Sequence, residues 1–468
     1  MAWRTLKRLL YWFPGLLSVC LLGFVLIQLS PGDPVLARLN LIPDAVSTHE
    51  SIYETAAYQS TRVELGLNRA PFYLSVQPIT VPDKLRSIAH PGRRKALQSL
   101  CIRRGDSSTV LDWYNAHIVL RFRLAESEPA MVQRIASEIL LQSETEEILR
   151  RYRLLTEACQ NAENAALVMQ AARIAAKLNE NQQGWKSLIP AFQWHGLNNQ
   201  FHRWLFGDSG EGGLIRGDFG RSYRDNQPVA PIVASAFSQT LILAIAAWML
   251  MFLVAVPGGL RLARIASPGK ARFWLHLLLV LYSIPSYWLG TLMLTFLCSP
   301  DFLNWFPVAY KLMDIPENTS WLSRQLIIIY HLILPVTCWT AAGAAFLAIQ
   351  TRKEAQAVMQ SKGYLGAKAR GLSDKQLMTN HVAPRALIPA IGWLGGLIPA
   401  SLSGAVAIEL IFSINGMGNL AFQSFHMRDY PVVMAIILIA ALTTLIGTVV
   451  SDLLLHYIDP RTREMTTK

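Results

Sequence analysis

The side chains able to catalyse a reaction or bind a metal are scattered through this sequence. Its five cysteines form no CxxC pair and no cluster with histidine, so a zinc site is not supported. His195 and His202 are seven residues apart beside Trp194 and Trp204, and on a helix they could share a face, but a metal would need further ligands. We find no nucleophile–base grouping and no Walker pattern, which argues against catalysis or ATP hydrolysis by this chain.

Two acidic residues near apolar segments are the other candidates for chemistry. Glu409 falls near the outer end of an apolar run, where a buried acid is costly and often functional, so it could line a substrate path. The alternative is an interfacial acid that pairs with Arg428 or reaches water. Asp429, beside Arg428, is better explained as part of a loop-structuring pair than as a ligand site. The GMG stretch at 416–418 predicts a turn.

A basic stretch at 362–389 interrupts the apolar second half of the chain. Residues 362–369 can form a short helix, and Gly371 should end it, since glycine disfavours helix interiors. Ser373 followed by Gln376 is typical of a capping box that starts a second helix. The pattern predicts a helical hairpin. The alternative is a solvated basic loop that only marks the cytoplasmic side.

The elements around these residues are apolar runs long enough to cross a bilayer. The chain has 468 residues, 52% hydrophobic and only 16% charged, against about 25% charged in a typical soluble protein. Six spans are predicted, near 9–29, 240–260, 275–298, 325–349, 387–412 and 432–458. No small-residue cleavage site follows the first, which we interpret as a retained anchor.

Basic residues in the connections predict the orientation. The connections at 261–274 and 350–386 are rich in Lys and Arg, as are both termini, whereas 299–324 and 413–431 are nearly balanced. All basic connections face the cytoplasm if there are six spans, and both termini are then cytoplasmic. The net charge of +12 could also indicate nucleic-acid binding, but many basic residues lie at the ends of apolar runs, which does not favour that function.

A long polar segment separates the first two spans and is predicted to be extracytoplasmic. Within it, apolar residues recur at three- and four-residue steps, at Val132, Ile135, Ile139, Ile148, Leu149, Tyr152 and Leu155. These predict amphipathic helices that pack on each other; a membrane-surface role is the alternative. A disulfide between Cys101 and Cys159 is allowed in that compartment. The fold class is thus an all-α integral membrane protein with six transmembrane helices and a mainly α-helical extracytoplasmic insert.

Several separate stretches resemble the inner-membrane permeases of ABC importers for dipeptides, oligopeptides and nickel, specifically the first of the two paired permeases. They occur in the family's order: QLSPGDP (28–34), RGDFGRSYRDNQPV (216–229), SIPSYWLG (283–290), HLILPV (331–336), KGYLGAKARGLS (362–373) and ELIFSINGMGNLAFQSF (409–425). On this resemblance we divide the chain into a first helix (1–30), an extracytoplasmic region (31–236), a five-helix permease core (237–460) with a coupling loop at 350–386, and a cytoplasmic tail (461–468).

The resemblance implies a transport permease rather than an enzyme. Its partners would be a second permease, two ATPase subunits that carry ATP and Mg²⁺, and a periplasmic binding protein; this chain would bind no cofactor of its own. The cargo implied is a short peptide, and the compartment is the bacterial inner membrane. The basic hairpin would be the coupling helix that docks on an ATPase subunit, through Ala367, Lys368, Ala369, Arg370, Gly371, Leu372, Ser373 and Lys375. Ala367, Ala369 and Gly371 would let that partner approach closely.

This sequence departs from the family pattern at two places. Leu365 and Gly366 stand where an Arg and a Thr are common. About 120 residues, near 76–197, separate LGLNRAPFYLS (65–75) from FHRWLFG (201–207), which resemble two halves of one family stretch. We expect the insert to rest on the partner permease or to help dock the binding protein. An alternative function is a membrane-anchored sensor or enzyme that acts through this insert.

Overall fold

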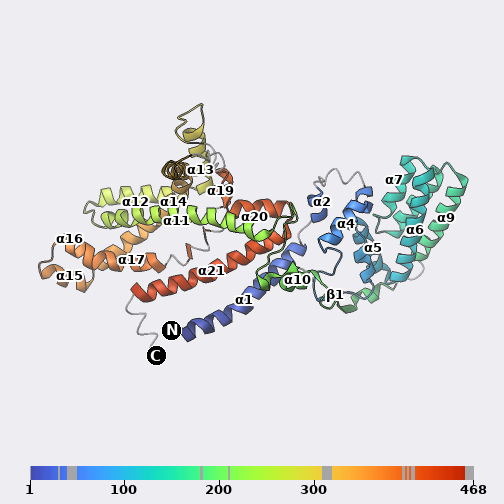
Figure 1. Ribbon diagram of the computed structural model, residues 1–468, viewed down its shortest axis with the longest axis horizontal. Helices are drawn as coiled ribbons and strands as arrows, with labels where there is room; N and C mark the ends of the chain where they lie inside the picture. The colour runs from blue at the N-terminus through green and yellow to red at the C-terminus, as the bar shows by residue number, and fades with distance from the viewer. Residues whose placement is uncertain are drawn as a thin grey trace. The chain divides into compact units, whose positions relative to one another are not determined.

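The chain forms two compact units, which are described separately. The computed structural model describes residues 2–29, 32–39, 50–179, 183–208, 211–307, 319–392, 396–397, 400–401 and 406–458 (Figure 1). Unit 1 contains residues 1–32 and 219–468, and unit 2 contains residues 33–218.

Unit 1 is built from helices. Its long elements are α1 (Ala2–Leu29), α11 (Val229–Ala263), α12 (Pro268–Ser283), α13 (Ser286–Met293), α14 (Trp321–Met359) and α21 (Tyr430–Ile458). Its shorter helices are α15 (Lys362–Ala369), α16 (Asp374–Leu377), α17 (Ala383–Gly392), α19 (Val406–Ile411) and α20 (Met417–His426), with π-helical turns at Leu294–Cys298 and Met378–Val382.

Within the described residues, four helices are long and apolar enough to cross a membrane, and a bent pair would make a fifth span. The four are α1, α11, α14 and α21, which correspond to predicted spans one, two, four and six. The bent pair is α12 with α13 and its π turn, which meet at 89°. The predicted span at 387–412 corresponds to α17 and α19, with residues 393–395, 398–399 and 402–405 lying outside the described residues.

The predicted span at 275–298 is sharply bent at Pro285. Ile284 has extended backbone angles, φ −75° and ψ 121°, because the proline ring excludes helical geometry from the residue before it. Pro285 then sits at the N-cap of α13. The proline in the SIPSY sequence indicates this bend. An average of hydropathy over many residues does not register a single proline.

Helices α11 and α14 pack side by side along much of their length (Figure 1). Close approach depends on Gly259, where an added Cβ would lie only 2.6 Å from the Ala348 carbonyl oxygen. Further along, the Thr340 hydroxyl donates a hydrogen bond to the Ala247 carbonyl at 3.2 Å. This helix pair forms the centre of the unit from which the loops discussed below project.

Unit 2 is centred on a bundle of five helices: α5 (Pro91–Arg104), α6 (Ser107–Ser127), α7 (Ala130–Ile139), α8 (Thr145–Ala158) and α9 (Ala162–Ala176). Capping residues in the sequence mark where these helices begin and end. Gly105 adopts a left-handed conformation at the end of α5, and the Asp106 and Asn161 side chains cap α6 and α9.

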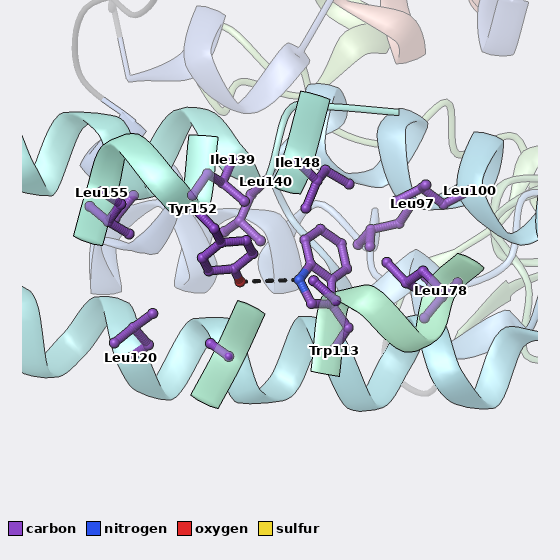
Figure 2. Packing of buried hydrophobic residues seen from close by; sticks show 14 of the residues in the cluster. Leu97, Leu100, Trp113, Leu120, Ile139, Leu140, Ile148, Tyr152, Leu155 and Leu178 are labelled. Carbon is purple, nitrogen blue, oxygen red and sulfur yellow. Dashed lines mark hydrogen bonds between the residues drawn. The ribbon is translucent and has the colours of Figure 1, made fainter. Parts of the chain in front are cut away.

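The predicted apolar face of the bundle is confirmed. Val132, Ile139, Ile148, Tyr152 and Leu155 are buried in one core, and Ile135 and Leu149 pack against it. Figure 2 shows Trp113 of α6 pointing at Tyr152 of α8 within this core, and the indole N–H donates to the Tyr152 oxygen at 3.1 Å. Cys101 is buried and Cys159 half-buried, and both are free thiols; burial raises the pKa of the Cys101 thiol to about 12.

A short two-stranded ribbon is formed by the segments that precede and follow the bundle in the sequence. Strands β1 (Leu74–Pro78) and β2 (Pro190–Trp194) are antiparallel, with Leu74 opposite Trp194 and Val76 opposite Phe192. The Gln200 amide also donates to the Ala70 carbonyl at 2.9 Å, so the two family-like stretches at 65–75 and 201–207 are brought together. The segment between the two strands therefore begins and ends side by side.

The remaining elements of unit 2 are short. The helices are α2 (Pro34–Arg38), α4 (Ala56–Glu64) and α10 (Gln200–Phe206), with 3₁₀ turns at Glu50–Glu54, Asp83–Ser87, Lys177–Asn179, Gly184–Leu188 and Leu214–Arg216. Strands β3 (Gly207–Asp208) and β4 (Glu211–Gly212) form a small hairpin. None of these elements was predicted from periodicity, because each is too short to show a repeat.

Candidate docking hairpin and buried carboxylates

The basic stretch folds as two short helices joined at a glycine, as its sequence predicts. The Ser361 hydroxyl accepts a hydrogen bond from the Tyr364 amide at 3.3 Å and starts α15. The helix ends at Arg370, and Gly371 follows with a φ of +84°, a left-handed conformation that glycine adopts without strain. The chain therefore turns where the sequence places its glycine.

The second helix of this hairpin begins with the predicted capping box. The Ser373 hydroxyl accepts from the Gln376 amide at 3.4 Å, and the Gln376 side chain accepts from the Ser373 amide at 3.0 Å. Helix α16 then continues through the π turn into α17. The hairpin is thus attached directly to longer helices at both of its ends, since α15 follows α14 closely.

One face of the hairpin is apolar and packs on unit 1. Tyr364, Ala367 and Leu377 are buried together with Ala263 of α11, Ala355 of α14 and Ala386 of α17. The expectation that Ala367 lets a partner approach is wrong, because its side chain is 0% exposed within this cluster. Its small size instead lets α15 lie close to the long helices.

The opposite face of the hairpin is exposed and basic. The exposed residues from the predicted coupling set are Lys368, Ala369, Arg370, Gly371, Ser373 and Lys375, and Leu372 is half-buried. Leu365, one of the two departures from the family pattern, is 55% exposed on this face. Small, apolar and cationic side chains together suit a groove with acidic residues at its rim.

Glu409 is fully enclosed by protein. Its two carboxylate oxygens accept hydrogen bonds from the Thr240 hydroxyl at 2.6 Å and from the Asn419 amide at 2.9 Å. The second bond falls in the first turn of α20, where helix amides need acceptors. The alternative that this acid reaches water is wrong, since the residue is 0% exposed. The structure gives Glu409 a role in fixing α20, and its place on a substrate path stays a prediction.

Thr240 was not identified from the sequence, although it joins two distant segments. Its hydroxyl accepts from the Met417 amide at 2.8 Å while it donates to Glu409, so α11 is linked to the start of α20. The prediction of a turn at GMG is wrong, because Gly416 is the N-cap of α20 and Met417 and Gly418 already belong to the first turn of that helix. A Cβ on Gly416 would lie 2.3 Å from a Glu409 carboxylate oxygen, and one on Gly418 would lie 2.6 Å from the Val406 Cα.

Asp429 holds the loop before α11 against the start of α21. Its carboxylate accepts hydrogen bonds from the Ser222 hydroxyl and from the Tyr223 amide, the latter at 2.9 Å. Burial raises the pKa of this carboxyl, and the hydrogen bonds oppose that shift. The prediction of a loop-structuring role is confirmed for Asp429, and its hydrogen-bond partners lie in the distant GRSY stretch.

Arg428 has its own structural place in the same region. It adopts a positive φ of 57°, and its guanidinium lies against Gly32, where an added Cβ would be 1.7 Å from the Arg428 Cζ. The PGDP stretch after α1 thus needs glycine because the arginine covers it.

The histidines do not form a metal site in the described part of the chain. His195 follows β2 and lies 2.8 Å from the Ser75 hydroxyl, whereas His202 is in α10 and lies 2.9 Å from the Tyr73 hydroxyl. The idea that both could share one helix face is wrong, because α10 begins only at Gln200. Among the described residues, no group of three His, Cys, Asp or Glu side chains could hold a metal ion.

Long apolar helices with a polar hairpin between two of them define a membrane-spanning protein. Residues 255–464 match the family of binding-protein-dependent transport system inner membrane components. The chain is 33% identical over 277 residues to the dipeptide transport system permease protein DppB of Haemophilus influenzae, an alignment that covers 54% of this chain and 79% of that protein.

Two further relatives agree with that match. The oligopeptide transport system permease protein AppB of Bacillus subtilis is 29% identical over 273 residues, covering 57% of this chain and 82% of its own. The peptidoglycan transport system permease protein YejB of Agrobacterium fabrum is 27% identical over 249 residues, covering 53% and 68%. The chain belongs to this family of inner-membrane transport permeases, and it is a multi-pass, mainly α-helical membrane protein.

Proposed function

We propose that this chain is a permease subunit of an ATP-driven importer of short peptides. It forms the translocation path with a second permease, and a periplasmic binding protein delivers the cargo. Two ATPase subunits bind ATP and Mg²⁺ on the cytoplasmic side, where both termini of this chain also lie. Relatives named as dipeptide and oligopeptide permeases support the cargo class. The basic connections support the orientation.

The observation that carries the coupling role is the two-faced hairpin of α15 and α16. Its buried face, through Tyr364 and Leu377, joins the ends of α11, α14 and α17 in one apolar cluster. Its exposed face presents Lys368, Arg370 and Lys375. The hairpin packs on its own protein through one face and offers a basic face to a partner. A displacement of the bound partner can therefore be transmitted through the hairpin to the long helices.

Coupling through this hairpin is a rigid-body movement. A closely packed cluster transmits displacement because its side chains cannot slide without opening voids. When the two ATPase subunits close, the docked hairpin moves with them, and the ends of α11, α14 and α17 follow. The spanning helices then change which side of the membrane the path opens to.

Copurification tests this function. The ATPase subunit should copurify with the intact chain in mild detergent and be lost with Arg370→Glu, because the reversed charge repels an acidic groove. Arg272→Glu is the matched control, since it reverses an exposed arginine on α12, away from the hairpin. Docking through the hairpin would be contradicted if both variants copurified with the same amount of ATPase subunit, or if both lost it.

A further inference from the structure

The ribbon of β1 and β2 exposes an apolar face. Val76 is 60%, Phe192 68% and Trp194 69% exposed, and the register places these side chains beside each other with Leu74. The Tyr73 ring stacks on Trp194 with centroids 6.0 Å apart. Contiguous exposed apolar patches of this kind mark a surface that is covered in the working protein.

The other face of the ribbon is polar and satisfied within the unit. The Ser75 hydroxyl lies 2.8 Å from the His195 ring, and the Gln77 amide donates to Asp83 at 3.2 Å and to the Val81 carbonyl at 2.9 Å. A two-sided ribbon normally turns its apolar side inward. Here the polar side faces the unit, so the outward apolar side has a function other than core formation.

The apolar face continues past the ends of the strands. The Ile79 amide donates to the Ile189 carbonyl at 3.0 Å, which extends the pairing, and Leu188 and Trp185 are 84% and 63% exposed. Residues 70–82 and 187–197 contain no Asp, Glu, Lys or Arg. Protein–protein interfaces usually surround an apolar centre with a polar rim that includes arginine, whereas these segments, with Trp185 included, carry a single charged residue, Lys186.

Unit 2 is attached to membrane helices by short connections. Helix α1 ends at Leu29 and unit 2 begins at Asp33, a stretch that can span at most about 15 Å. At the other end, about ten residues separate Asp218 from α11. The first residues of unit 2 are therefore held close to the end of a membrane helix whatever the orientation of the unit. Tryptophan and phenylalanine with aliphatic neighbours are the side chains that bind at the lipid–water boundary.

We propose that the apolar face of the ribbon, formed by Leu74, Val76, Phe192 and Trp194 with Leu188 and Trp185, inserts into the interfacial region of the bilayer. The face holds unit 2 against the lipid as a monotopic contact. Lys186, between Trp185 and Leu188, is suited to a lipid phosphate. The contact does not depend on cargo, ATPase or second permease.

Photo-crosslinking from the full-length chain tests this contact. The purified chain, with p-benzoylphenylalanine in place of Phe192, is reconstituted in vesicles of phosphatidylethanolamine and phosphatidylglycerol that carry a radiolabelled lipid, and it is illuminated. The control carries the same group in place of Phe122, which is 60% exposed on α6 of the bundle. Placement at Trp194 gives a second reading if the Phe192 variant does not fold.

The expected result is several-fold more lipid adduct from position 192, or 194, than from position 122. Equal labelling of ribbon and bundle would overturn the proposal, because the face would then be no closer to lipid than any exposed surface. In native membranes, adducts from position 192 that run predominantly as a larger polypeptide would also overturn it and assign the face to a protein partner. Neither result bears on whether the chain transports peptides.

Discussion

The helical bundle of unit 2 and the loops around Glu409 in unit 1 bury polar groups in different ways. In the bundle, Trp113 and His117 both hydrogen-bond to the Tyr152 hydroxyl inside an apolar core, between helices that are close in sequence. In unit 1, Glu409 and Asp429 accept from hydroxyls and backbone amides of segments far away in the chain. The first arrangement stabilises a local fold, and the second fixes where distant loops meet.

The His117 network satisfies the polar atoms of three side chains buried in the bundle. The Ala136 carbonyl can only accept, so the His117 Nε2–H donates to it at 2.8 Å, and Nδ1 accepts from the Tyr152 hydroxyl at 2.6 Å. The Tyr152 oxygen in turn accepts from Trp113. Burial lowers the pKa of His117 to about 4, so the ring is neutral at physiological pH.

The largest expected effect is in the bundle core. Trp113→Ala removes a side chain that is 0% exposed and should destabilise unit 2 by about 3–5 kcal/mol, because a cavity remains. Faster hydrogen exchange of the α6 and α8 amides measures it. Trp113→Phe, which keeps most of the volume, should cost much less. A small effect of both variants would show that this core does not hold the unit together.

Acidification should weaken the bundle and not the loops of unit 1. The ordinary His pKa is 6.5 and that of His117 in the fold is about 4, so the unfolded chain takes up its proton first as pH falls. The stability is complete above about pH 6.5, and roughly 3 kcal/mol is lost by pH 4. Exchange rates of α6 amides across this range measure the loss, and His117→Gln should remove its part of the pH dependence. An unchanged profile in that variant would assign the loss to other groups.

Removal of the Glu409 carboxylate tests the long-range arrangement. Glu409→Leu leaves the Thr240 hydroxyl and the Asn419 amide without their acceptor and should destabilise unit 1 by about 2 kcal/mol. A lower melting temperature of the full chain in detergent reports it. Glu409→Gln keeps one oxygen acceptor and is expected to fall between the leucine variant and the native chain. A native melting temperature with reduced peptide uptake would instead support a place on the substrate path.

The smallest expected effect is at the hairpin cap. Ser373→Ala removes the hydroxyl that accepts from Gln376 and should cost about 1 kcal/mol locally. Hydrogen exchange at the start of α16 should accelerate while that in the bundle does not change. Equal acceleration in both regions would contradict the division of the chain into separate units.

Local features of the hairpin and the bundle could be predicted from the sequence, because each depends on neighbouring residues. The hairpin depends on residues within a few positions of each other, namely Gly371, Ser373 and Gln376. The apolar residues that recur through 132–155 likewise predict the buried faces of consecutive helices. Ala367 was misplaced because spacing alone does not say which face of a helix meets its own protein.

Other features could not be predicted because they depend on residues far apart. Thr240 lies 169 residues before Glu409, and Ser222 lies 207 before Asp429, so no local pattern pairs them. The proline at 285 indicates a bend, but the bend angle of 89° depends on how the surrounding helices pack. The ribbon was missed because each of its strands has only five residues, so apolar and polar residues alternate over too short a stretch to stand out.

The central claim is that the exposed face of the α15–α16 hairpin docks on an ATPase subunit. The most direct measurement is photo-crosslinking in native membranes with p-benzoylphenylalanine in place of Leu365, compared with the same group in place of Leu326, which is 59% exposed on α14 outside the hairpin. The account predicts a covalent adduct with a nucleotide-binding subunit from position 365 and none from position 326. An assembled, transporting complex that gives no such adduct from position 365 would contradict it.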